Sequence, residues 1–308
     1  MRFSVQLPTD RVSKGEEFLA GDAVAEMAQA VEAAGFDACF VTDHPFPDDR
    51  WLAGGGHHAL DPFVALSFAA AATSRLRVQT HVMVLPYRNP FLAAKAAASL
   101  DVLSGGRLIL GVSAGYLKSE FAALGADFEA RNDVADEAIR AIRAAWTDEG
   151  VKLSGRGFEA RGNTMLPRPR QRPHPPIWVG GNSRRAIRRA VELGDAWVPF
   201  PTQPGGARFV RTARMESPDD LRERLAYLRE RAEQVGRTRP LEVALVPFGL
   251  DMFTRGAFDA PRFLEGAERL AELGVSWLTV SLPSRTRAEY CSEAERFGQE
   301  IIEKLRDR

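Results

Sequence analysis

The sequence is poor in cysteine, has no surplus of charge of either sign, and contains no long hydrophobic run. Only two of the 308 residues are cysteines, and the positions of Cys39 and Cys291 match neither a disulfide framework nor a metal-binding motif. The 41 basic and 41 acidic residues balance, which removes any bulk electrostatic case for nucleic acid or an anionic membrane as a partner. No run of about 18 apolar residues is present, so no membrane span is expected.

Several familiar signals are also missing. Residues Met1–Pro8 lack the apolar core of a signal peptide, which together with the scarce cysteines leads us to expect a cytoplasmic protein. No Walker-A pattern occurs, and no G-x-G-x-x-G follows the first predicted strand. The neighbouring His57 and His58 have no cysteine or carboxylate cluster beside them, so we expect a loop there and no metal site.

What the chain does contain is a regular alternation of short apolar segments with Ala-rich helical patterns. Near-continuous apolar strands of this kind are buried on both faces, which is typical of a parallel sheet. The predicted strands are Arg2–Leu7, Ala38–Thr42, Arg77–Val84, Leu108–Ser113, Pro176–Val179, Ala196–Pro199, Glu242–Val246 and Ser276–Ser281.

Helical patterns occupy the intervals between these strands. Asp61 and Asn89 each precede a proline and are expected to be N-caps, and Gly35, Gly194 and Gly274 are expected to end helices in the left-handed conformation. The predicted helices are Asp22–Ala34, Asp61–Ala70, Asn89–Leu103, Val134–Trp146, Ser183–Leu193, Asp219–Val235, Phe263–Leu273 and Ala288–Leu305.

Eight β/α units predict a single domain over residues 1–308, folded as a (β/α)8 TIM barrel. A doubly wound open sheet is the alternative, which the number of units and the missing G-x-G-x-x-G disfavour. Two segments interrupt the rhythm. Lys152–Pro175 is expected to form a hairpin or a loop excursion, and Phe200–Pro218 a loop that closes over a substrate.

In a parallel barrel, functional side chains gather where the strands end. His44 ends the second predicted strand, where it either exchanges a proton with a bound ligand or caps a loop. By alternation His81 shares a face with Gln79 and Met83, and a hydrogen-bonded core histidine is the favoured interpretation there. The small residues of Gly111–Gly115 allow a flat ligand to approach closely.

Trp178–Arg185 is the most informative single motif. An apolar strand ends at Gly180 and Gly181, after which Asn182 or Ser183 is expected to cap a helix. Free N–H groups at a helix N-terminus form an anion site, and Arg184 and Arg185 add positive charge, so a phosphate is the expected guest. An ordinary strand-to-helix turn is the alternative.

Taken together and in this order, five blocks resemble the luciferase-like monooxygenase superfamily, and the likeness spans nearly the whole chain. It is strongest to the actinobacterial branch that uses the deazaflavin coenzyme F420, while users of FMN share the same blocks. The blocks are Phe40–His44, Leu85–Pro90, Leu100–Gly115, Pro176–Ser183 and Leu193–Trp197.

This resemblance implies a TIM-like barrel that holds a flavin or deazaflavin in its mouth. It implies His44 as the catalytic residue beside the ring, and a non-proline cis peptide within Thr80–Val82, which we assign to the bond between His81 and Val82. The residues implied to bind the cofactor are Thr80, His81, Val82, Ser113, Ala114, Gly115, Tyr116, Gly180, Gly181, Asn182, Ser183 and Arg184.

One position departs from the family's pattern. Sugar-phosphate dehydrogenases of the deazaflavin branch carry a glutamate directly after the fourth-strand glycine, where this sequence has Tyr116. A tyrosine has an ordinary pKa near 10 and is a poor base at neutral pH, so the sequence disfavours a sugar-phosphate oxidation that uses an acid at this place.

The resulting hypothesis is an oxidoreductase that transfers a hydride between coenzyme F420 and a small organic substrate. An FMN-dependent monooxygenase served by a separate flavin reductase is one alternative. A non-catalytic carrier or sensor of such cofactors is another, and a barrel enzyme that binds a phosphorylated substrate without a redox cofactor is a third. Because the family dimerises through barrel helices, the Ala-rich helix 63–72 is a candidate homodimer contact.

Overall fold

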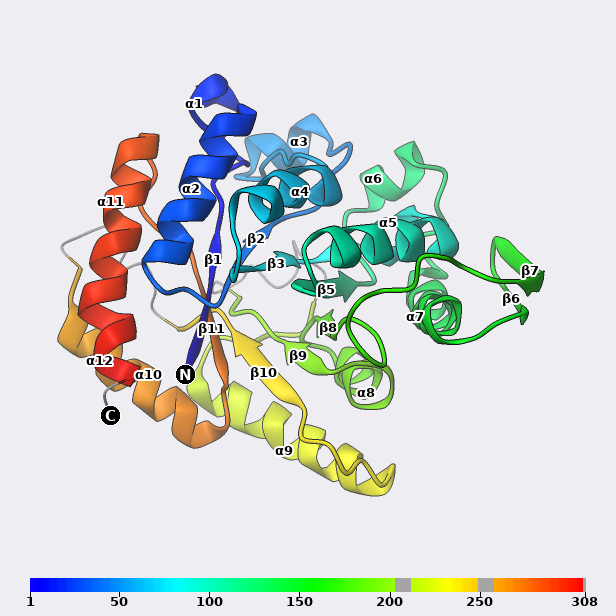
Figure 1. Ribbon diagram of the computed structural model, residues 1–308. Coiled ribbons are helices and arrows are strands. Elements are labelled where there is room, and N and C mark those ends of the chain that lie inside the picture. The colour runs from blue at the N-terminus through cyan, green and yellow to red at the C-terminus, as the bar shows by residue number, and fades with distance from the viewer. Residues whose placement is uncertain (203–211, 249–257, 307–308) are drawn as a thin grey trace.

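The computed structural model describes residues 1–202, 212–248 and 258–306. Its main sheet is a closed parallel barrel, as the sequence predicts: β3, β2, β1, β11, β10, β9, β8 and β5 follow one another, and β5 pairs back with β3. Figure 1 shows these strands at the centre with the longer helices around them. The barrel strands are β1 (Arg2–Gln6), β2 (Ala38–Val41), β3 (Arg77–Thr80), β5 (Leu108–Ser113), β8 (Ile177–Gly180), β9 (Ala196–Val198), β10 (Glu242–Leu245) and β11 (Trp277–Val280).

The third predicted strand is interrupted in the structure. It forms β3 and then β4 (Met83–Val84), both of which pair with β5, and the peptide between His81 and Val82 at the break is cis, as expected. Because the break disrupts the alternation of side chains, Met83 does not share a face with His81. Met83 is fully buried in the apolar core, to which Val78 also belongs.

Helices cover the outside of the barrel (Figure 1). All eight predicted helices are present, within a few residues of the expected bounds, and several short ones follow strands or precede helices. The helices are η1 (Val12–Lys14), α1 (Glu16–Leu19), α2 (Gly21–Ala33), α3 (Asp49–Ala53), α4 (Pro62–Ala72), η2 (Leu85–Tyr87), α5 (Pro90–Leu103), α6 (Lys118–Ala123), α7 (Arg131–Thr147), α8 (Arg184–Leu193), α9 (Pro218–Gln234), α10 (Ala260–Leu273), α11 (Arg287–Phe297), η5 (Gly298–Ile302) and α12 (Glu303–Arg306).

Most of the expected helix ends are confirmed. Asp61 and Asn89 accept backbone N–H groups as N-caps, and Gly35 and Gly274 have positive φ. Gly194 was expected to be left-handed, and this is wrong: its φ is −111°. A Cβ there would lie 2.9 Å from Val179 Cγ2, so close packing against β8 explains the glycine. No helix in the described ranges is long and apolar enough to cross a membrane.

Two segments were predicted to interrupt the alternation of strands and helices, and the structure describes them to different extents. Lys152–Pro175 does contain an antiparallel hairpin, formed by β6 (Val151–Gly155) and β7 (Phe158–Asn163), which projects beside α7 in Figure 1. Of the predicted loop Phe200–Pro218, residues 203–211 lie outside the described part of the chain, so the expected closure over a substrate stays a prediction. Thr202 and Met215, on either side of this gap, are joined by backbone and side-chain hydrogen bonds.

Apolar packing separates the two ends of the barrel. A large core lies between the strands and the surrounding helices. A smaller cluster fills the barrel itself, where the rings of Trp178 and Trp277 meet edge to face with centroids 4.9 Å apart. Both tryptophans sit in the amino-terminal half of their strands, so the interior is filled there and the carboxyl ends remain open.

Candidate active site

A cavity of about 390 Å³ opens at the carboxyl ends of the barrel strands, where this fold places its chemistry. Most of the residues predicted from the sequence line it together. These are His44, His81, Val82, Ser113, Ala114, Gly115, Tyr116, Gly180, Gly181 and Ser183. Three predicted residues, Thr80, Asn182 and Arg184, do not line it.

His44 is held by a buried carboxylate that the sequence interpretation did not single out. Glu120, in α6, is fully buried, and its Oε2 lies 3.3 Å from His44 Nδ1. The same carboxylate accepts the Tyr87 hydroxyl at 2.9 Å and the Phe46 N–H at 2.9 Å. Burial raises the pKa of Glu120, but the hydrogen bonds from His44 and Phe46 outweigh it, so the net pKa is lowered.

This arrangement fixes the direction of the imidazole. An ionised carboxylate only accepts hydrogen bonds, so Nδ1 of His44 carries the proton that faces Glu120. The other ring nitrogen, Nε2, is then left for the cavity. His44 can therefore accept or donate a proton at Nε2 while Glu120 keeps its orientation, which is the geometry of a general acid or base.

Aromatic rings surround His44, and two of them, those of His57 and Tyr116, also line the cavity. Trp51 lies 4.4 Å from the His44 ring between centroids, His57 lies 5.0 Å away edge-on, and Tyr116 lies 6.0 Å away. Burial and the charge of Glu120 raise the pKa of Tyr116 to about 12, so its hydroxyl stays protonated at neutral pH. These rings form a partly apolar wall that presents few hydrogen-bonding atoms.

His57 is a second residue whose role was missed. It was predicted to lie in a loop, which is so, but its ring lines the cavity and its Nε2 lies 3.1 Å from Thr42 Oγ1. Burial, followed by the charges of His44 and His58, lowers the pKa of His57 to about 4. At neutral pH it therefore offers the site a neutral imidazole.

The cis segment forms the floor of the cavity. Val82 is so close to β5 and β8 that a Cβ on Gly111 would lie 3.3 Å from its Cγ1 and a Cβ on Gly180 would lie 3.2 Å from its Cγ2. Thr80, predicted to bind cofactor, instead donates its hydroxyl to the Gly111 carbonyl at 2.7 Å, because it faces β5 and not the cavity.

His81 combines the two interpretations that the sequence left open. Its ring is hydrogen-bonded, with Nδ1 3.1 Å from Gln79 Nε2, and it lies 4.5 Å from the Phe40 ring between centroids. It nevertheless lines the cavity. Burial lowers its pKa to about 4, so His81 also contributes an uncharged ring at neutral pH.

The anion site at the start of α8 is formed by backbone and hydroxyl groups. Ser183 is the N-cap and accepts the Ala186 N–H at 3.2 Å. Gly181 has a φ of 126° and, with Ser183, lines the cavity at the positive end of the helix dipole. This part of the predicted phosphate site is therefore assembled as expected.

The side-chain contributions predicted for this anion site are wrong in part. Asn182 is fully buried and ties the chain together, donating to the carbonyls of Phe200 at 2.8 Å and Ala213 at 3.0 Å. Arg184 points away, with its guanidinium 5.0 Å from the Tyr227 ring centre. Arg185 is neutralised by ion pairs with Asp133 and Asp136.

Two other arginines supply the positive charge. Arg131, the first residue of α7, and Arg189, on α8, both line the cavity. Arg189 is buried and paired with Asp136, whereas Arg131 Nη1 donates to the Phe128 carbonyl at 2.8 Å. A carbonyl does not cancel the charge, so Arg131 is available to an anionic ligand. Periodicity had identified the helices but not which of their arginines turn inward.

The sequence Gly111-Val112-Ser113-Ala114-Gly115 matches the G-x-S-x-G motif that surrounds the nucleophilic serine of many hydrolases. In the structure Ser113 accepts the Gly115 N–H at 3.3 Å, and no hydrogen bond of the described residues joins it to a histidine. The next helix begins only at Lys118. The strand–turn–helix geometry and the base that such a nucleophile needs are therefore absent from this part of the chain.

Comparison with known proteins agrees with this site. Residues 1–250 match the Luciferase-like monooxygenase family. The chain belongs to this family. The match covers β1 to β10 and so includes nearly every residue that lines the cavity.

Similar proteins include one that is named for FMNH2 and one that is named for coenzyme F420. The Mycobacterium tuberculosis protein Rv0940c is 30% identical over 262 residues, covering 81% of each chain. An FMNH2-dependent dimethylsulfone monooxygenase from Pseudomonas putida is 34% identical over 174 residues, covering 55% of this chain and 46% of that one. The coenzyme F420-dependent tetrahydromethanopterin reductase of Methanopyrus kandleri shares the fold, with a TM-score of 0.72 at 17% identity over 98% and 99% of the two chains.

Proposed function

We propose that this luciferase-like oxidoreductase transfers a hydride between coenzyme F420 and a small organic substrate. His44 is the catalytic residue, and the cavity holds the deazaflavin. The observation that carries the proposal is the pairing of His44 with the buried Glu120 beside the cis segment, at the open end of the barrel. A bound deazaflavin would supply the carbon that accepts or donates the hydride.

The residues present fit such a group. Val82, Ala114 and Gly115 give one flat, small-residue surface for a ring. The Gly181 backbone and the Ser183 hydroxyl at the start of α8 suit a phosphate, and Arg131 adds an accessible charge on the opposite wall. A ring with an anionic side arm matches this combination of an apolar floor and a positively polarised end.

In this proposal the chain's own task is to control one proton. Glu120 keeps Nδ1 of His44 protonated, and Tyr87 and the Phe46 N–H keep Glu120 ionised. Nε2 of His44 then takes the proton that an alcohol-like substrate loses, or returns it to a carbonyl-like one. The rings of Trp51 and Tyr116 limit the access of water to this nitrogen.

An FMN-dependent monooxygenase, served by a separate reductase, is the second candidate. The dimethylsulfone monooxygenase favours this candidate, because that relative is named for FMNH2. It is 34% identical over 174 residues, whereas the mycobacterial protein is 30% identical over 262 residues. The anion site at α8 would suit the FMN phosphate equally well, so affinity for the cofactor is the property that separates the two.

Parallel titration of the purified protein with F420 and with FMN, followed by fluorescence, tests the proposal. Tighter binding of F420 supports it, tighter binding of reduced FMN supports the monooxygenase, and binding of neither refutes both. His44→Ala should still bind cofactor and should lose about 10²–10⁴-fold in turnover of any substrate found. A carrier or sensor would instead show no turnover in either form.

We also propose a location and an oligomeric state for the protein. The first is a cytoplasmic location. The second is a homodimer formed through α4, where Val64 and Phe68 expose 59% and 51% of their surface, with Leu92 of the neighbouring α5 exposed by 72%. Light scattering of the wild-type protein and of Phe68→Glu tests the dimer, which the variant should dissociate.

A further inference from the structure

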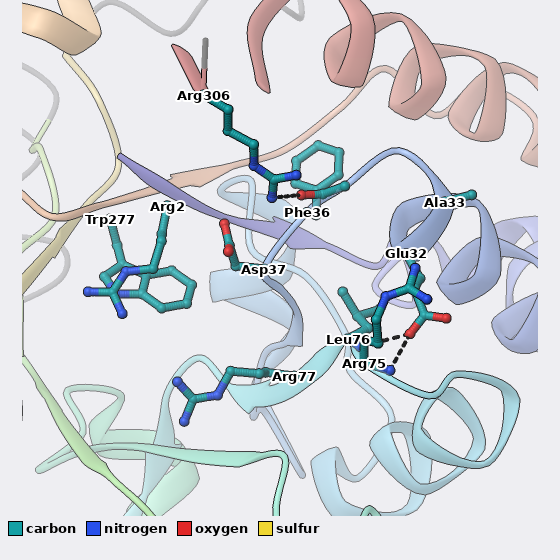
Figure 2. Close-up of a pocket in the computed structure, with 11 residues that line it drawn as sticks. Arg2, Glu32, Ala33, Phe36, Asp37, Arg75, Leu76, Arg77, Trp277 and Arg306 are labelled. Carbon is teal, nitrogen blue, oxygen red and sulfur yellow. Dashed lines mark hydrogen bonds between the residues drawn. The ribbon is translucent and has the colours of Figure 1, made fainter. Parts of the chain in front are cut away.

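Figure 2 shows a second cavity, of about 530 Å³. It lies at the opposite end of the barrel from the candidate active site, because Arg2, Arg77 and Trp277, which line it, are the first residues of their strands. It is bounded by the amino-terminal ends of β1, β3 and β11 and by the turn between α2 and β2. The two cavities share no lining residue. Its volume falls within the range of roughly 300–1,000 Å³ that is typical of small-molecule sites.

Positive charge dominates this second cavity. Four arginines line it, against two carboxylates, in a chain whose formal net charge is zero. Both carboxylates are engaged by backbone N–H groups: Asp37 accepts from Phe3 at 2.8 Å, and Glu32 accepts from the N–H groups of residues 74 to 76. The arginines are Arg2, Arg75, Arg77 and Arg306.

Arg77 is only weakly satisfied by hydrogen bonds. It is half-buried, its hydrogen bond to Gln171 Oε1 is long at 3.5 Å, and no ion pair joins it to a carboxylate in the described ranges. Burial lowers the pKa of Arg77. The charge of Glu242 raises this pKa, and the charge of Arg2 lowers it by a smaller amount. The carboxylates of Glu242, Asp101 and Asp37 attract Arg77 from nearby but do not offset its burial, so an anion that accepted hydrogen bonds from its guanidinium would be stabilising.

Arg2 is held in place beside it. Its guanidinium lies 4.6 Å from the Trp277 ring centre, and its Nη2 donates to Glu242 Oε1 at 2.7 Å. Trp277 Nε1 donates to the other oxygen of Glu242. Figure 2 shows the guanidinium groups of Arg2 and Arg77 on the same side of Asp37. Two guanidiniums, of which that of Arg2 is paired with Glu242, thus border the same cavity.

We propose that this cavity binds a phosphate group, either inorganic phosphate or a phosphate monoester, with Arg77 as the principal ligand and Arg2 as the second. A doubly charged tetrahedral anion can accept hydrogen bonds from both guanidiniums. The site is independent of the proposed redox function, because neither arginine contacts the cavity that contains His44.

Two-dimensional NMR of the indole N–H groups tests this site. The Trp277 indole reports on it through Glu242, and the Trp51 indole, beside His44, reports on the active site. Inorganic phosphate and glycerol phosphate are titrated separately at constant ionic strength. A saturable shift of the Trp277 signal supports the proposal, and tighter binding of one ligand identifies the source of the phosphate. A shift of the Trp51 signal alone, or a linear drift of all signals, overturns it.

Matched variants complete the test. Arg77→Gln should weaken phosphate binding at least about tenfold, Arg77→Lys should weaken it less, and Arg140→Gln should leave it unchanged, because Arg140 is an exposed residue of α7 remote from this cavity. Thermal unfolding establishes that each variant is folded. If Arg77→Gln is folded and binds phosphate like the wild type, or if Arg140→Gln weakens binding as much as Arg77→Gln does, screening by surface charge explains the shift and the site is refuted.

Discussion

His44 Nδ1 lies 3.3 Å from Glu120 Oε2, although the two residues are 76 positions apart and come from different β/α units. The loop after β2 supplies the histidine, and α6, after β5, supplies the carboxylate. Closure of the barrel brings these two strand ends to the same rim. The most specific chemical feature of the site is therefore a product of the tertiary fold.

Replacing Glu120 by glutamine should destabilise the protein at neutral pH. The amide removes a charged acceptor from a buried group of three donors, which corresponds to about 1–3 kcal/mol in the free energy of unfolding. Because the folded-state pKa of Glu120 is lowered, the stabilisation is present above the unfolded pKa of about 4.3 and is lost as the pH falls below it. Urea unfolding at pH 7 and pH 4 measures this, and an equal difference at both values would contradict it.

His57 and His81 should make stability depend on pH in the mildly acidic range. Burial is the main cause that lowers both pKa values from 6.5 to about 4, so the unfolded chain binds more protons between these values. The free energy of unfolding should fall as the pH drops from 6.5 to 4, by up to about 1.4 kcal/mol per pH unit for each histidine. His57→Gln should reduce this slope. NMR titration of the ring protons checks it directly, and values near 6.5 would refute the buried, neutral state.

Arg131 and Arg184 form a matched pair for cofactor binding. Arg131 lines the cavity, whereas Arg184 packs on Tyr227 outside it, although the two have the same charge and both begin a helix. Arg131→Gln should weaken binding of the phosphate-bearing cofactor about 10–100-fold, and Arg184→Gln should change it less than about threefold. Calorimetry with the preferred cofactor measures both affinities. A larger loss of affinity for Arg184→Gln than for Arg131→Gln would show that the anionic part of the cofactor does not lie beside Arg131.

Gly115 and Gly125 separate crowding from backbone strain. Both have positive φ, 77° and 68°, but a Cβ on Gly115 would lie 2.5 Å from Val84 Cγ1, while a Cβ on Gly125 would meet nothing within 4 Å. Each alanine variant incurs the cost of left-handed backbone, about 1 kcal/mol, and Gly115→Ala should add at least about 1–3 kcal/mol for overpacking. Denaturant unfolding of the two variants compares them. Equal losses in the free energy of unfolding would mean that Val84 and its neighbours can move enough to accommodate the added methyl group.

The barrel could be predicted from the sequence because each strand is a short, almost continuously apolar segment. Leu108–Ser113 keeps its predicted bounds, and the other strands differ at their ends by a residue or two or, for Arg77–Val84, by a break at the cis peptide. Resemblance to the family supplied the position of that break. Periodicity alone could not, because nothing in the sequence pattern of residues 77–84 marks the place where the strand is interrupted.

Prediction of the site was less complete, for a physical reason. Residues at strand ends, such as His44 and Gly181, can be recognised because the direction of a parallel strand fixes where its end lies. Glu120 and Arg131 lie on or at the start of helices beyond the loops, and a helix can turn any of its faces toward the mouth. A carboxylate within the first turns after the fourth barrel strand was the available signal for Glu120, since Tyr116 already occupied the position expected for an acid.

Asn182 anchors both sides of one loop with a single side chain, through the carbonyls of Phe200 and Ala213. Phe200 and Ala213 both line the cavity, so the turn between β8 and α8 holds two parts of its wall through one amide group. Loss of that amide would loosen both parts at once, although it would leave His44 and Glu120 in contact.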